Sequence, residues 1–260
     1  QKMIGASLTL TQKYTAVGNG AGHGLGDYLY GALTVFESAH RCGLIPRADF
    51  SEHAISNYLL PSAGNTVGPL QTVFHEDSSR PLASPGVVFT NKRPKEKISP
   101  AALDWLRAEA LPPNEELRHA VDKAMLALEL KDKDFFSIHV RLEDSETAAG
   151  DPNREAAMTA WATVSKIKTR LSSRGDVVLF TNSSLLRDLA RGEGVKTYDA
   201  NAVHLGAHEN DPRDVLDTLV EFFLMSKSRH IVQLSRYSWG SGFSEIAGLL
   251  GGIRVSKVTI

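Results

Sequence analysis

The sequence has almost no cysteine and no long apolar run. Cys42 is the single cysteine among 260 residues, so the chain cannot form an internal disulfide. This favours a reducing compartment such as the cytoplasm, and the apolar sequence around Cys42 predicts that it lies in the core. Because the sequence starts at Gln1, an excised domain of a larger protein is the alternative. No run reaches the 18 or more apolar residues that a membrane helix needs. We therefore expect no transmembrane segment in this chain.

An excess of charge of either sign is also missing. Lys and Arg number 29 against 30 Asp and Glu, which gives a net charge of −1. This balance leaves no overall attraction for nucleic acid, so we expect no nucleic-acid partner and only a local anion site. Paired Cys/His spacing for zinc and the Gly-x-Ser-x-Gly pattern of serine hydrolases are absent too, and His204 and His208 have no Glu between them. We expect no metal site.

The second half of the chain alternates between short apolar runs and helical patterns. The runs at 135–140, 177–180 and 230–234 are typical of buried parallel strands, and helices are expected at about 154–173, 184–192 and 212–227. Asp211 and Pro212 predict the start of the last helix. This alternation indicates an α/β protein.

The first half of the chain has a different pattern of segments. A Gly-rich stretch at 17–27 precedes a helical pattern at 28–42. Residues 45–100 are rich in turns with short strands, and a further helical segment covers about 100–131. The charged residues 131–134 separate that segment from the strand at 135–140. The sequence thus predicts an N-terminal lobe at 1–131 and a C-terminal lobe at 132–260.

The strongest candidate for a functional motif follows the strand at 135–140. His139 and Arg141 lie on the same face by alternation and at the carboxyl end of the strand, where open α/β sheets bind ligands. A guanidinium suits phosphate because its planar fork makes two charge-assisted hydrogen bonds. The alternative is a surface ion pair of Arg141 with Glu143 or Asp144.

Two glycine- and serine-rich stretches could also approach an anion. Residues 235–242 follow a strand and precede an apparent helix start, where backbone N–H groups attract phosphate. A plain serine-rich turn is the alternative there. The loop at 18–26 matches neither a dinucleotide fingerprint nor a P-loop, so it indicates only that the backbone comes close to a ligand or to another element.

Taken in order, these motifs resemble those of the GDP-fucose-dependent fucosyltransferases. The similarity is greatest to the α-1,6-fucosyltransferase and nodulation fucosyltransferase branch, followed by the α-1,2 and protein O-fucosyltransferases. The residues that carry it are the segments Gly22–Gly26, His139–Asp144, Phe180–Leu186 and Glu221–Ser226, the last running on to Ser238.

The resemblance implies a GT-B-type α/β fold, with two Rossmann-like lobes, parallel sheets and a small N-terminal lobe. It implies an inverting, metal-independent glycosyltransferase that moves fucose or a related sugar from a GDP-sugar to a glycan or glycoprotein acceptor, without a further cofactor. By the same likeness, Arg141 binds the pyrophosphate, His139 contacts the nucleotide and Glu221 reads guanine. The phosphate turn would contain Ser235, Tyr237 and Ser238, and the first loop would approach the pyrophosphate at Gly24 and Gly26.

The base that deprotonates the acceptor is where this sequence departs from the resemblance. The α-1,6 branch has a glutamate ten residues after the motif histidine, and Ala149 occupies that place here. We choose Asp144, with Glu143, Glu146 and Asp151 near enough to replace it. A second departure is Leu142, which stands where the family has a second arginine.

Two other functions remain open from the sequence. A transferase of the same fold could use a different nucleotide sugar, such as a xylosyl or rhamnosyl donor. A carboxylate at Glu221 favours guanine over uracil or thymine, because guanine offers two adjacent N–H donors. A non-catalytic nucleotide- or carbohydrate-binding module would keep Arg141 without needing a placed base.

Overall fold

The computed structural model describes residues 8–14, 23–61, 70–73, 82–95, 97–142, 151–199, 203, 205–206, 211–236 and 240–260, with backbone only at 151–153. The chain divides into two compact units. The first comprises 1–115 with 204–210, and the second comprises 116–203 with 211–260. Nearly all of α3 (Glu115–Ala127) therefore belongs to the second unit, whereas the sequence placed the boundary after this helix, at 131/132.

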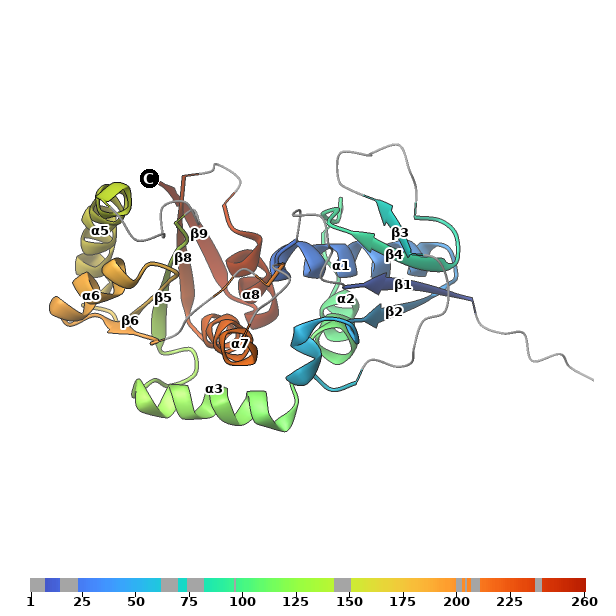
Figure 1. The fold of residues 1–260 in the computed structure, drawn as a ribbon, viewed down its shortest axis with the longest axis horizontal. Coiled ribbons are helices and arrows are strands. Elements are labelled where there is room, and N and C mark those ends of the chain that lie inside the picture. The colour runs from blue at the N-terminus through green and yellow to red at the C-terminus, as the bar shows by residue number, and fades with distance from the viewer. Residues whose placement is uncertain are drawn as a thin grey trace, which may run out of the picture. The chain divides into compact units, whose positions relative to one another are not determined.

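The first unit is built on a parallel sheet. Its described strands are arranged in the order β2-β1-β4-β3 and pair in parallel (Figure 1). Helix α1 packs on this sheet, with Val35 and Ala39 in an apolar cluster with Leu10 and Val88. The bounds are β1 (Thr9–Lys13), α1 (Leu25–Arg41), β2 (Ile45–Asp49), the 3₁₀ turn η1 (Ala54–Asn57), β3 (Leu70–Val73) and β4 (Gly86–Thr90).

The expected helix at 100–131 is broken in two. Helix α2 (Pro100–Trp105) continues into a π turn, η2 (Leu106–Ala110), and α3 begins only at Glu115. Pro112 and Pro113 lie in the gap, and proline ends a helix because it lacks an N–H and its ring clashes with the preceding turn. The residues between the two helices contact another segment of the chain instead, since the Leu60 amide donates to the Pro112 carbonyl at 2.7 Å.

Cys42 was also misplaced by the sequence analysis. It is exposed rather than buried. The helix ends at Arg41, and Cys42 is the C-cap residue beyond its last turn. The apolar stripe of α1 therefore stops before it reaches Cys42.

Residues 204–210 join the first unit through a buried histidine. The Leu205 carbonyl lies 2.7 Å from Nε2 of His53, and Leu205 is itself buried. The other ring nitrogen, Nδ1, accepts from the Ile55 amide at 3.2 Å, so Nε2 carries the hydrogen and donates to Leu205. The His53 ring also stacks on Tyr14, with ring centroids 3.9 Å apart.

Gly31 lets α1 approach the first sheet closely. A Cβ built on Gly31 would lie 1.7 Å from the Thr90 carbonyl oxygen, which belongs to strand β4. We expect Gly31→Ala to lower the free energy of unfolding of the first unit by about 2 kcal/mol or more, because backbone has to move. The measurement is denaturant unfolding, with Gly192→Ala as control, since a Cβ on Gly192 meets nothing within 4 Å. Equal stability of the two variants would contradict the close packing.

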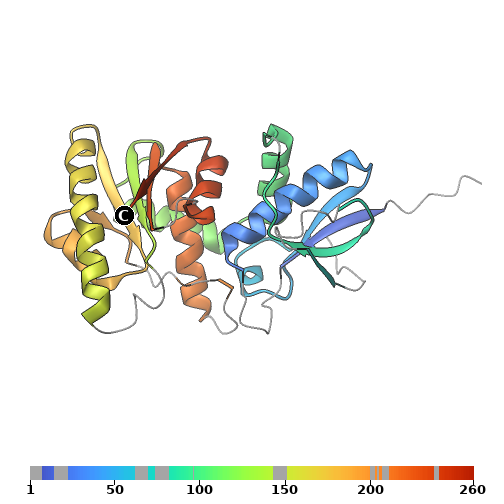
Figure 2. The same cartoon turned by 90° about the horizontal axis from the view of Figure 1, so that it is seen from above.

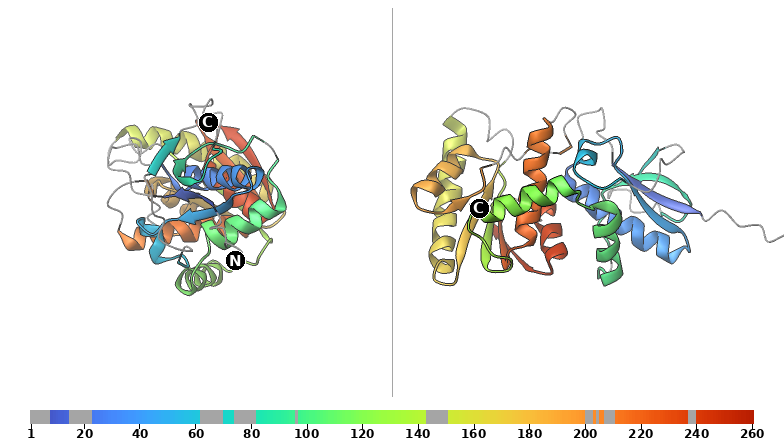
Figure 3. Two further views of the ribbon diagram at one scale, coloured as in Figure 1. Left: turned by 90° about the vertical axis from the view of Figure 1, so that its right-hand side faces the viewer. Right: turned by 90° about the horizontal axis from the view of Figure 1, so that it is seen from below.

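The second unit is a parallel sheet with helices on both faces. Its described strands are arranged in the order β7-β6-β5-β8-β9 and all pair in parallel. Helices α5 and α6 cover one face, and α7 and α8 cover the other (Figures 2 and 3). The bounds are β5 (Phe135–Val140), α5 (Asp151–Leu171), β6 (Asp176–Thr181), α6 (Ser184–Gly192), β7 (Lys196–Thr197), α7 (Pro212–Ser226), β8 (His230–Ser235), α8 (Gly242–Gly251) and β9 (Arg254–Thr259).

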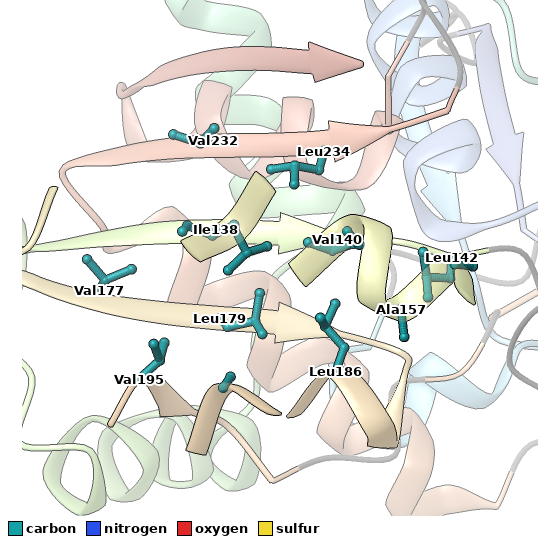
Figure 4. Packing of buried hydrophobic residues seen from close by; sticks show 14 of the residues in the cluster. Ile138, Val140, Leu142, Ala157, Val177, Leu179, Leu186, Val195, Val232 and Leu234 are labelled. Carbon is teal, nitrogen blue, oxygen red and sulfur yellow. The ribbon is translucent and has the colours of Figure 1, made fainter. Parts of the chain in front are cut away.

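The core between this sheet and α5 determines which side chains face the opposite way. Ile138, Val140 and Leu142 pack in one apolar cluster with Val232 and Leu234 (Figure 4). Because successive side chains of a strand alternate, the residues between them point to the face covered by α7 and α8. These residues include His139, Arg141 and Gln233, which are polar side chains on this face of the sheet.

Candidate functional site

The sheet of the second unit has its topological switch point between β5 and β8. From β5 the chain moves outward through β6 and β7, and it then returns to place β8 and β9 on the other side of β5. The segments that leave the carboxyl ends of β5 and β8 therefore run in opposite directions, which is where open α/β sheets bind ligands. Arg141 follows β5 directly and Ser235 ends β8, so both predicted residues lie at this point.

His139 is held as a neutral, buried side chain at this edge. Its Nδ1 lies 3.1 Å from the hydroxyl of Ser244 in α8, and its ring packs against Phe243 at a centroid distance of 5.8 Å. Burial lowers the pKa of His139 to about 3, with a further contribution from the nearby Arg141 charge. The imidazole therefore carries no charge at neutral pH.

The backbone beyond Arg141 is clamped by Asn182. The Asn182 side chain accepts from the Leu142 amide at 3.0 Å and donates to the Leu142 carbonyl at 2.9 Å. Two hydrogen bonds to one residue fix the chain as it leaves β5. Asn182, which lies in the segment 180–186, thus positions the end of the neighbouring strand.

Glu221 is a buried carboxyl group on α7 with an unused acceptor. It is 2% exposed, and its Oε1 has no hydrogen-bond partner. Burial raises the pKa of Glu221 to about 8, and Asp217 acts in the same direction. Arg187 and Arg141 oppose this shift with their positive charges. A donor brought by a ligand would satisfy the free oxygen.

Two of the three charged residues that shift the pKa of Glu221, Arg187 and Asp217, are themselves held in place by hydrogen bonds. Arg187 is buried on α6 and donates from Nη1 to the Thr181 carbonyl at 2.9 Å. Asp217 lies one turn before Glu221 on α7 and accepts from the Tyr198 hydroxyl at 3.2 Å. The site around Glu221 therefore has a fixed charge pattern rather than mobile surface ions.

Helix α8 presents its N-terminus beside β8. Ser241 is the N-cap residue, and its side chain makes no capping hydrogen bond. Its amide instead donates to Oε1 of Gln233 at 2.8 Å. Backbone amides at a helix start attract anions, so this turn is suited to a phosphate group.

The predicted residues fall into three groups. His139, Arg141, Glu221 and Ser235 come together in the second unit. Gly24 and Gly26 belong to the first unit, where Gly24 is the N-cap residue of α1 and Gly26 is buried in its first turn. Outside the described residues lie Glu143, Asp144, Glu146, Tyr237 and Ser238, and for Asp151 only the backbone is described.

Sequence reasoning missed four residues of this site: Arg187, Asp217, Gln233 and Ser244. Alternation could have identified Gln233, because it stands between apolar residues of a buried strand. The other three lie on helices and carry no motif, and only the tertiary arrangement brings them to the strand ends.

Metal-binding clusters and membrane-spanning helices are both absent from the described part of the chain. No three His, Cys, Asp or Glu side chains gather there so that they could hold a metal ion. Among these same residues, no helix combines the length and the apolar character needed to cross a bilayer.

Several solved structures share the fold. NodZ α-1,6-fucosyltransferase co-crystallised with GDP has a TM-score of 0.59 at 14% identity, covering 94% of this chain and 93% of that chain. Selenomethionine NodZ from Bradyrhizobium gives 0.59 at 13%, covering 94% and 92%. A variant of Arabidopsis thaliana FUT1 in complex with GDP gives 0.54 at 14%, covering 99% and 71%. No protein-family model and no curated protein matches the sequence.

These likenesses confirm the expected fold class. The protein is of mixed α/β type, with two units built on parallel sheets, and its fold is the GT-B-like fold of NodZ. At 13–14% identity this likeness extends to the fold alone.

Proposed function

We propose that the protein is a fucosyltransferase-type glycosyltransferase that binds a GDP-sugar in its second unit. It would transfer fucose or a related sugar to a glycan or glycoprotein acceptor. The observation that carries this proposal is that a cation, Arg141, and a buried carboxylate with an unused acceptor atom, Glu221, lie near the same switch point. Arg141 matches a diphosphate, and the free Oε1 of Glu221 matches the N–H groups of guanine.

The fold neighbours support the choice of nucleotide. NodZ was co-crystallised with GDP and also soaked with GDP-fucose, and the Arabidopsis FUT1 variant was solved in complex with GDP. Uracil and thymine offer no adjacent pair of N–H donors to a carboxylate, so Glu221 favours a guanine nucleotide over either. The donor is a substrate, and the proposal includes no further cofactor.

The proposed reaction is an inverting, metal-independent transfer. The bond between the sugar's anomeric carbon and the phosphate oxygen breaks, and GDP leaves with the electron pair. The Arg141 guanidinium and the amides at the start of α8 would stabilise the charge that grows on this leaving group. The acceptor oxygen forms the new bond from the opposite face, and its proton passes to a carboxylate.

We assign the base role to Asp144, which keeps the motif position three residues after Arg141. Asp144→Asn is expected to lower kcat about 100-fold or more while GDP affinity stays within about twofold, because a base acts in the transition state. Steady-state kinetics and calorimetry measure the two effects. If Glu146→Gln or Asp151→Asn shows this behaviour and Asp144→Asn does not, the assignment is wrong.

The test of the proposal as a whole is titration calorimetry of the full chain with GDP, UDP and GDP-fucose, with and without EDTA. We expect tight GDP binding that is insensitive to EDTA, followed by transfer in an acceptor screen. Preference for UDP would indicate a transferase with a different donor. Binding without transfer to any acceptor would indicate a non-catalytic module.

A further inference from the structure

A chain of three side chains fixes the hydrogen position on His139. His139 on β5 and Gln233 on β8 are direct cross-strand partners, and both point to the face covered by α8. Between them lies Ser244 of α8, whose hydroxyl is 3.1 Å from His139 Nδ1 and 2.9 Å from Gln233 Oε1. All three residues are buried.

The orientation of the Gln233 amide follows from its second contact. The backbone amide of Ser241 lies 2.8 Å from the same atom of Gln233. An amide N–H can only donate, so the Gln233 atom that it meets has to be the oxygen. Gly240 keeps this geometry possible, because a Cβ there would come within 2.5 Å of Gln233 Nε2.

The direction of the remaining hydrogen bonds is then determined. Gln233 Oε1 has no hydrogen, so the Ser244 hydroxyl donates its single hydrogen to it. The other acceptor near this hydroxyl is the Ser241 carbonyl at 3.4 Å, which also draws the hydrogen away from His139. The hydroxyl can therefore only accept from His139, and Nδ1 has to carry the ring hydrogen.

We propose that Gln233 and Ser244 are positioning residues that hold His139 in its Nδ1–H form, so that Nε2 accepts a hydrogen bond from an O–H or N–H group of the nucleotide sugar. This inference rests on the proposed function for the identity of the ligand. In this arrangement His139 and Arg141 bind different groups of the nucleotide sugar. A neutral ring nitrogen without hydrogen repels phosphate oxygens, which are acceptors, so Arg141 alone of the two binds the phosphates.

The first half of the proposal is tested without any ligand. Long-range ¹H–¹⁵N correlation spectra of the labelled full chain distinguish Nδ1–H from Nε2–H imidazole. We expect Nδ1–H for His139 in the wild type and in Gln233→Glu, which keeps the acceptor oxygen. Ser244→Ala and Gln233→Leu should give a mixture of both forms. A purely structural role for these residues would leave the tautomer unchanged.

Ser256→Ala is the matched control for this experiment. Ser256 makes the comparable contact at the other end of β8, where its hydroxyl lies 2.9 Å from His230 Nε2. Its loss should change the signals of His230 and leave those of His139 as they are. Observation of Nε2–H at His139 in the wild-type protein would overturn the proposal.

The second half is tested with guanine nucleotides and analogues that differ from one another in the hydrogen-bond donors of the ribose, the base or the sugar. Affinities for GDP, 2′-deoxy-GDP, 2′,3′-dideoxy-GDP, inosine diphosphate and GDP-fucose separate the ribose, base and sugar as the source of the hydrogen bond. We expect one comparison to differ about tenfold in the wild type and to become equal in His139→Phe. If no comparison depends on His139, the acceptor role is wrong. If GDP itself does not bind, both the proposed function and the acceptor role of His139 are wrong. The tautomer experiment needs no ligand, so its result on Gln233 and Ser244 is unaffected.

Discussion

Replacing Arg141 with alanine is expected to lower transferase activity by about 100- to 1,000-fold and GDP affinity by at least tenfold. The guanidinium follows β5 at the switch point of the second sheet, and its backbone leads into the segment clamped by Asn182. A planar fork can make two charge-assisted hydrogen bonds to the diphosphate, so we expect its loss to have the largest effect where charge develops on the leaving group. Kinetics and calorimetry measure both quantities.

Two further variants separate charge from geometry. Arg141→Lys keeps the positive charge but lacks the planar fork, and it should fall between the wild type and alanine. Arg174→Ala removes an exposed cation at the opposite end of the sheet, where the guanidinium lies over the Phe136 ring. This control should bind GDP normally. Full activity of Arg141→Ala with an unchanged unfolding midpoint would refute the phosphate role.

Replacing Glu221 with glutamine is expected to abolish most GDP binding while making the empty protein more stable at alkaline pH. Guanine offers two adjacent N–H donors, and a carboxylate can accept both. Glutamine has one acceptor, and its NH₂ group faces a second donor. We expect a loss of about tenfold or more in GDP affinity from this mismatch.

The stability effect follows from the raised pKa of Glu221, which is about 8 in the folded protein against an ordinary value of 4.5. Between these values the folded state holds a proton that the unfolded state has released. The free energy of unfolding therefore falls as pH rises through this window, by up to about 1.4 kcal/mol per pH unit. Glutamine cannot ionise, so the variant lacks this contribution. The two proteins should be alike near pH 4.5, and the variant should be the more stable at pH 8.

The wild type should also bind GDP more tightly as pH rises from 6 to 8, because the ionised carboxylate is the form that accepts both donors. The measurements are denaturant unfolding and calorimetry across this range. Asp188→Asn is the control, since it removes an exposed carboxylate that pairs with Arg191 on the surface of α6. A pH profile in Glu221→Gln identical to that of the wild type would show that another group is responsible.

Local pattern was sufficient for the elements of the second unit that are buried on both sides. The strands β5, β6 and β8 are short, mostly apolar and buried. The predicted start of α7 was confirmed by the Asp211 side chain, which accepts from the Arg213 amide. The strands β1, β7 and β9 were not predicted, and β2, β3 and β4 were expected only as unplaced short strands within residues 45–100. Most of them are short or partly exposed, so their pairing depends on neighbours that are distant in sequence.

The candidate site shows the same division. Alternation along one strand placed His139 and Arg141 on one face, and the structure has them there. The protonation of His139 and the raised pKa of Glu221 were beyond sequence reasoning, because each depends on groups from other elements. Ser244 reaches His139 from α8, and Arg187 reaches the surroundings of Glu221 from α6.

The segment that returns from the second unit to the first has a consequence for synthesis on the ribosome. Leu205 completes the buried hydrogen bonds of His53, and this residue is made long after β1–β4. During translation, His53 of the first unit therefore lacks the Leu205 carbonyl as a hydrogen-bond partner until β5, β6 and β7 have been synthesised. A gene cut after residue 115 would encode a fragment that lacks this partner permanently, so the two halves should be expressed together.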